Sequence, residues 1–100
     1  MTTLKGWLGE EHGERDGITY RWLYYKCPVH GDKHNDCIPV SLLYPACNVN
    51  GFEIWHGELK DNILTVTPSI SNTVCGYHDF YQFELVEEGV IGSETIYDDI

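Results

Sequence analysis

The stretch that decides the fold is residues 18–31, ITYRWLYYKCPVHG. Its first nine residues are dense in aromatic and β-branched side chains, which favour the pleated surface of a strand. A Cys-Pro-Val-His-Gly turn follows, in which Pro28 restricts the backbone and Gly31 can adopt a positive φ. The stretch therefore predicts a strand that runs directly into a metal-binding knuckle.

A second pair of the same kind lies 48 positions further on, in Cys75-Gly76-Tyr77-His78. Thiolate and neutral imidazole are ligands that suit Zn²⁺, and Cys₂His₂ is a common closed ligand set for structural zinc. The entropy cost of joining two distant turns grows only slowly with the length of chain between them. We therefore expect one zinc ion, bound by Cys27, His30, Cys75 and His78.

Other assignments of the cysteines and histidines stay open at this stage. His34 or Cys37, in the segment HNDC that follows the first knuckle, could replace His30 as a ligand. The four cysteines could instead form disulfides or pack as small apolar side chains. Cys47 has no ligand type near it in the sequence, and we expect it to be packed.

The rest of the chain favours strands. Apolar, β-branched and alternating segments occupy residues 37–44, 52–56, 63–67 and 80–86, and Asn50-Gly51 indicates a tight turn. No segment keeps a helical period over three turns. The pattern predicts one domain over residues 1–100, mainly β: a small antiparallel, zinc-ribbon-like sheet with two zinc knuckles. Within it we expect an irregular N-terminal arm (1–17), a core (18–91) and an acidic C-terminal tail (92–100).

The charge is strongly and unevenly negative. The formal net charge is −10; residues 1–60 carry eight acidic and six basic side chains, whereas residues 61–100 carry eight acidic ones and no Lys or Arg. Such a surface repels phosphates and disfavours direct nucleic-acid binding, but it suits a basic protein partner. The N-terminus lacks a secretory signal pattern, and no apolar run approaches the roughly 20 residues that cross a bilayer.

Several motifs in sequence order carry a resemblance. CPVHG at 27–31, His34, IPV at 38–40, WHGEL at 55–59, PSI at 68–70 and CGYH at 75–78 resemble a small domain-of-unknown-function family of zinc-binding β-proteins common in bacteriophages and bacteria. The chain departs from that pattern at His30, where the family favours cysteine, and at Asn35-Asp36-Cys37, which looks like an insertion. The resemblance implies a zinc site and a phage or prokaryotic origin. We expect a location in the host cytoplasm or the virion, without secretion by a signal peptide.

These observations predict a non-enzymatic, zinc-stabilised protein-interaction module that is phage-encoded. It would be a virion component, such as a capsid decoration or tail protein, or a small inhibitor of a host protein; a homo-oligomer is also compatible. The alternative is a zinc-dependent hydrolase or deaminase-like enzyme, with Glu58 or Asp79 as general base. That alternative requires a three-ligand zinc site with an open position for water.

Overall fold

The computed structural model describes residues 1–87, with the exception of the side chain of Asp32. Nine strands and no helix occur in this part of the chain, so no helix there could span a membrane. The mainly β prediction is confirmed. The strands are β1 (Thr2–Arg15), β2 (Ile18–Cys27), β3 (Gly31–Ser41), β4 (Cys47–Val49), β5 (Phe52–Lys60), β6 (Ile63–Thr67), β7 (Ile70–Asn72), β8 (Tyr77–Asp79) and β9 (Tyr81–Leu85).

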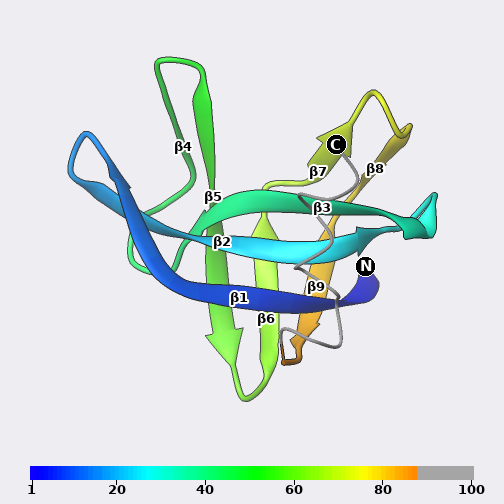
Figure 1. Cartoon of the computed structure of the whole chain (residues 1–100). Coiled ribbons are helices and arrows are strands. Elements are labelled where there is room, and N and C mark those ends of the chain that lie inside the picture. Colours follow the sequence, from blue (N-terminus) through cyan, green and yellow to red (C-terminus); the bar gives the residue numbers. More distant parts are fainter. Residues whose placement is uncertain (88–100) are drawn as a thin grey trace.

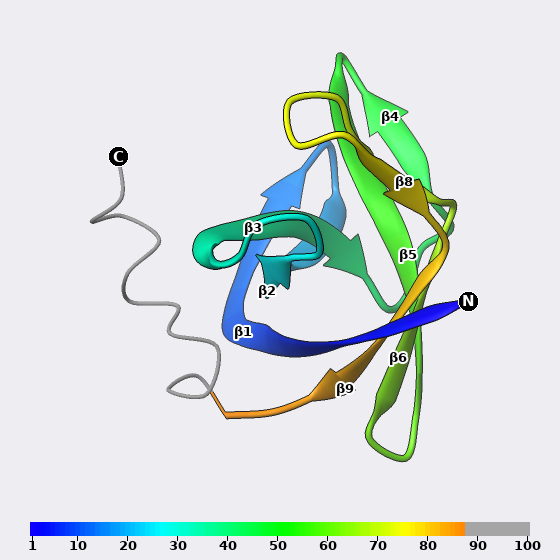
Figure 2. The same cartoon turned by 90° about the vertical axis from the view of Figure 1, so that its right-hand side faces the viewer.

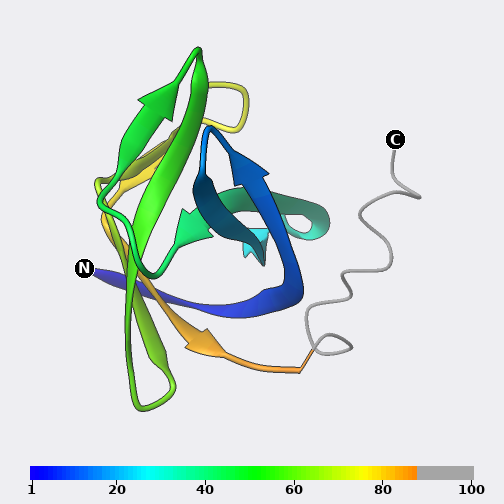
Figure 3. The same cartoon turned by 90° about the vertical axis from the view of Figure 1, so that its left-hand side faces the viewer.

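The main sheet closes into a barrel. Its strand order is β3-β2-β1-β9-β6-β5-β4, and an additional parallel pairing of β3 with β5 joins the two sides into a ring of six strands. Figure 1 shows β1, β2 and β3 crossing over β5, β6 and β9, and Figure 3 shows the sheet curling round on itself. The expected zinc-ribbon-like antiparallel sheet is therefore wrong. Both the closure and the parallel pairing of β1 with β9 depend on contacts between distant segments.

The barrel closes where β3 pairs with β5, next to Gly57. Val40 and Ser41 of β3 pair with Trp55 and His56 of β5. A Cβ atom on the next residue, Gly57, would lie only 2.6 Å from Cγ1 of Val40. Glycine at this position leaves room for the side chains of Val40 and Leu64, which a larger residue would displace.

The N-terminal segment is a strand rather than an irregular arm. β1 runs over 14 residues, pairs antiparallel with β2 and parallel with β9, and buries Leu8 in the barrel. Its many Gly and Glu residues hide this in the sequence, because they interrupt the apolar alternation that normally indicates a strand. The predicted acidic tail (92–100) and the end of the predicted core (88–91) lie outside the described residues.

Buried side chains from several strands fill the interior of the barrel. Leu23 and Tyr25 of β2 alternate inward and are fully buried, as are Leu64, Val66 and Phe83 of β6 and β9. The rings of Tyr25 and Phe83 lie 5.1 Å apart between centroids. The two-residue turn at Asn50-Gly51 joins β4 to β5 as predicted.

β7 and β8 form a separate two-stranded sheet that pairs with no barrel strand. Figure 1 shows the tips of this hairpin and of the β2–β3 hairpin on the right-hand side of the molecule, which is the side that faces the viewer in Figure 2. Ile70, Cys75 and Tyr77 attach it to the core through their buried side chains. The candidate site lies between these two hairpins.

Candidate metal centre

Four side chains with metal-ligand chemistry meet where the two hairpins approach each other. Cys27, His30 and His34 come from the β2–β3 hairpin, and Cys75 comes from the turn between β7 and β8. One sulfur or ring nitrogen from each lies within 4.8 Å of all the others. This group could hold a metal ion.

Two of the six distances between the ligand atoms agree with the edges of a tetrahedron. Sγ of Cys27 lies 3.4 Å from Nδ1 of His30, and Sγ of Cys75 lies 3.2 Å from Nδ1 of His34. Bond lengths of 2.3 Å to sulfur and 2.0–2.1 Å to nitrogen imply a sulfur–nitrogen edge of about 3.5 Å in a tetrahedral zinc site. These two sulfur–nitrogen pairs are therefore spaced as in a tetrahedral site, and all ligand atoms lie within 4.8 Å of one another.

The sulfurs face the protein and the imidazoles face outward. Cys27 is 1% exposed and Cys75 is 9% exposed, whereas His34 is half-buried and His30 is exposed. Burial, together with the neighbouring Cys27 thiol, raises the pKa of Cys75 to about 11. The metal-free thiol is therefore protonated at neutral pH, and a metal ion must displace that proton when it binds.

The first turn is built to present both of its ligands. β2 ends at Cys27, and Gly31 begins β3 with a φ of 60°, in the left-handed region that glycine adopts most readily. The amide N–H of His30 donates to Sγ of Cys27 over 3.4 Å. Such N–H···S bonds stabilise a thiolate and help to orient it towards a metal.

The second turn is shaped by Asn72. Its side-chain oxygen accepts hydrogen bonds from the amides of Val74 (2.9 Å) and Cys75 (3.0 Å), and its backbone oxygen accepts one from Gly76 (2.7 Å). Gly76 has a φ of 85°, which glycine adopts without strain. Asn72 thus fixes the turn that carries the Cys75 thiol.

A buried polar network links this turn to the barrel. The side-chain nitrogen of Asn72 donates to Asp36 over 2.9 Å, the Tyr77 hydroxyl donates to the same carboxylate oxygen, and the hydroxyls of Tyr77 and Tyr25 lie 2.9 Å apart. Burial raises the pKa of both tyrosines well above the ordinary value. Asp36 follows His34 by two positions on β3, so the network lies next to the ligand cluster along the chain.

Three of the four predicted ligands meet, and the fourth lies elsewhere. His78 is exposed on β8, where its Nε2 lies 2.8 Å from the hydroxyl oxygen of Ser69. The strand alternation explains this, because its neighbour Tyr77 points into the core and His78 must therefore point out. His34 occupies the position that we expected His78 to fill.

The remaining cysteines are outside the cluster. All four cysteines are free thiols, so no disulfide forms between them. Cys37 and Cys47 are half-buried, and burial raises the pKa of Cys37. Only the distances between two hairpins show that His34, and not His78, is the fourth member of the cluster. In the sequence, the only indication that His34 could join the cluster was its position close after Cys27 in the same predicted hairpin.

No protein family matches the chain, and neither a curated protein nor a solved structure shows significant similarity to it. The resemblance of the motifs to a zinc-binding β-family stays a prediction.

Proposed function

We propose that this protein is a β-barrel in which a zinc ion cross-links the β2–β3 and β7–β8 hairpins (the zinc staple), and that it acts by binding a protein partner and not by catalysis. The observation that carries the proposal is the convergence of Cys27, His30, His34 and Cys75, with ligand atoms within 4.8 Å of one another. A set of two sulfurs and two imidazole nitrogens suits Zn²⁺ better than the hard cations, which prefer oxygen.

The number of ligands supports a structural role for the ion. Four protein ligands complete the tetrahedron that zinc prefers, and a catalytic site needs one position free for water or substrate. Asp79, a candidate base for a hydrolase, accepts hydrogen bonds from the Thr2 hydroxyl (2.7 Å) and the Phe80 amide (2.7 Å). Glu58 is exposed on β5. Neither carboxylate belongs to the ligand cluster.

The charge of the chain supports a basic partner. With a net charge of −10, the protein would attract a cationic surface and repel nucleic acid. We propose a viral structural protein or a basic host protein as that partner, in the virion or the host cytoplasm. Recovery with purified particles would favour the first, and a salt-sensitive complex with one host protein would favour the second.

The proposal is tested by elemental analysis of the purified full chain and four variants. Cys75→Ser and His34→Gln each remove one proposed ligand, whereas the matched controls Cys47→Ser and His78→Gln remove the same chemistry from outside the cluster. We expect about one zinc per chain in the wild type and both controls, and little or none in the two ligand variants.

A second measurement tests the ligand set on the wild-type protein, so it does not depend on whether the ligand variants fold. Wild-type protein loaded with Co²⁺ should show the visible absorption of tetrahedral cobalt together with sulfur-to-metal charge transfer, and the His78→Gln spectrum should be the same. Full zinc content in Cys75→Ser, or loss of zinc in His78→Gln, would contradict the proposed ligand set.

A further inference from the structure

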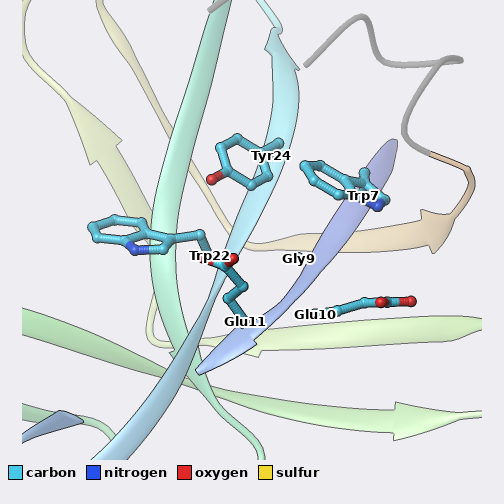
Figure 4. A pocket seen from close by; sticks show the side chains of 6 residues that line it. All are labelled: Trp7, Gly9, Glu10, Glu11, Trp22 and Tyr24. Carbon is cyan, nitrogen blue, oxygen red and sulfur yellow. The ribbon is translucent and has the colours of Figure 1, made fainter. Parts of the chain in front are cut away.

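A groove lined by aromatic rings and carboxylates lies on the outer surface of β1 and β2. It is a cavity of about 380 Å³, a volume typical of small-ligand sites. Figure 4 shows Trp22, Tyr24 and Trp7 from left to right, with the Glu11 side chain directed towards Trp22 and the Glu10 side chain below Trp7, its carboxylate directed outward. We call this the aromatic groove, and its lining residues are Trp7, Gly9, Glu10, Glu11, Trp22 and Tyr24.

A β-bulge places the two carboxylates there. Leu8 pairs with Leu23 and His12 pairs with Arg21, so three residues of β1 lie opposite the single residue Trp22 of β2. Gly9, Glu10 and Glu11 are the three residues of the bulge. Bulges of this kind redirect side chains and are enriched beside functional sites.

The bulge is held in place by its own hydrogen bonds. Nε of Arg21 donates to the carbonyl of Gly9 over 2.6 Å, and Nη2 reaches the carbonyl of Leu8 at 3.5 Å. On the outer face, the rings of Trp7 and Tyr24 stack with centroids 4.8 Å apart. The walls of the groove are therefore preorganised before any ligand arrives, which lowers the entropy cost of binding.

The groove carries negative charge with no counter-charge in its lining. Glu10 and Glu11 are exposed, and within residues 1–87 neither carboxylate makes an ion pair or a hydrogen bond. The lining contains no Lys or Arg. Elsewhere on the surface the protein already pairs an arginine with an aromatic ring, because the guanidinium carbon of Arg15 lies 4.0 Å from the centroid of Phe52.

We propose that the aromatic groove binds the guanidinium group of an arginine side chain in a basic segment of the partner protein. A planar guanidinium stacks on aromatic faces and donates several hydrogen bonds to carboxylates, and the groove offers both surfaces together. This inference rests on the proposed function for the existence of a protein partner. It adds where that partner binds and which of its side chains is recognised.

The test is an NMR titration of the full, zinc-loaded chain with a capped Gly-Arg-Gly peptide. The indole N–H signals of Trp7 and Trp22 report on the groove. The indole of Trp55 donates to the carbonyl of Ser69 over 3.3 Å and serves as an internal reference. We expect saturable shifts at Trp7 and Trp22, none at Trp55, weaker binding of the lysine peptide, and no binding of the uncharged citrulline peptide.

Two double variants test the carboxylates. Glu10→Gln with Glu11→Gln removes the charges of the groove, and Glu53→Gln with Glu58→Gln removes two exposed charges from β5. We expect the first pair to weaken binding of the arginine peptide about tenfold or more, since it removes charge-assisted hydrogen bonds. The second pair should change it by less than about twofold.

Four results would overturn the inference: no binding of the arginine peptide, equal binding of the citrulline peptide, lysine binding as tight as arginine binding, or the same loss in both double variants. Zinc content is measured on the same samples. A folded, zinc-loaded protein that fails to bind the peptide would reject the groove and leave the zinc site standing. A chain that binds the peptide but takes up no zinc, either as purified or after addition of Zn²⁺, would reject the zinc site and leave the groove standing.

Discussion

Strand β2 takes part in two sites that are stabilised in opposite ways. In its middle, Trp22 and Tyr24 face the bulge of β1, where hydrogen bonds from Arg21 and ring stacking fix the walls of the aromatic groove. At its end, Cys27 belongs to a cluster of four side chains that could hold a metal ion. The first site is formed entirely by the protein's own groups, whereas the second would bind a metal under the function proposed above.

The difference follows from how each region is attached. β1 and β2 are barrel strands with partners along their length, but β7 and β8 pair only with each other. An isolated two-stranded hairpin is marginally stable in water. The hairpin therefore depends on the buried side chains of Ile70 and Tyr77 and on the proposed metal bond through Cys75.

Removal of the metal should have the largest effect and should separate the two regions. After chelation, we expect amide exchange in residues 70–79 and 27–34 to become faster by about two orders of magnitude or more, because these segments lose their cross-link. Amides of β1 and β2 beside the groove should change by less than about tenfold. Equal loss of protection in both regions would show that the metal supports the whole barrel and not one end.

Replacement of Arg21 should have an intermediate effect in the opposite region. Arg21→Met leaves the carbonyls of Gly9 and Leu8 without their donor, and we expect a loss of about 1–2 kcal/mol in the free energy of unfolding. Arginine-peptide binding should weaken while zinc content stays unchanged. Arg15→Met, which removes an equal charge from above the Phe52 ring, is the control and should leave peptide binding intact. Zinc loss in Arg21→Met would contradict the independence of the two sites.

The smallest effect concerns the hydrogen bond from Thr2 of β1 to Asp79 of β8, which forms without a metal. The Thr2 hydroxyl and then the Phe80 amide lower the pKa of Asp79, which ends β8. A lowered pKa in the folded state contributes stability above the ordinary carboxylate pKa, and that contribution is lost as the pH falls through the lowered value. We expect Thr2→Val to raise the pKa of Asp79 towards 3.8, measured by carboxyl NMR against pH.

The matched control for that titration is Thr3→Val. It removes a hydroxyl that accepts a hydrogen bond from Gln82 and does not contact Asp79. If the pKa of Asp79 is the same in Thr2→Val as in the wild type, the link between β1 and β8 does not involve this hydrogen bond.

Local patterns predicted the local structure well. The aromatic segment before Cys27 is a strand, Asn50-Gly51 is a tight turn, and segments 52–56, 63–67 and 80–86 lie in β5, β6 and around β9. β1 was missed because the bulge interrupts its alternation at Gly9-Glu10-Glu11, which is also why the groove could not be anticipated. An insertion of this kind has no periodic signal.

The sequence by itself determined the chemistry: a β-rich chain, an excess of carboxylates, and two Cys-x-x-His pairs of the type that binds zinc. These properties depend on side-chain composition and on spacing within one turn or one strand. Only the tertiary structure decided that the sheet closes into a barrel, that His34 and not His78 lies beside Cys27, His30 and Cys75, and that Glu10 and Glu11 flank aromatic rings. The physical reason is that strand partners and register are set by packing between segments far apart in the chain, and a shift of one residue reverses the face on which a side chain lies.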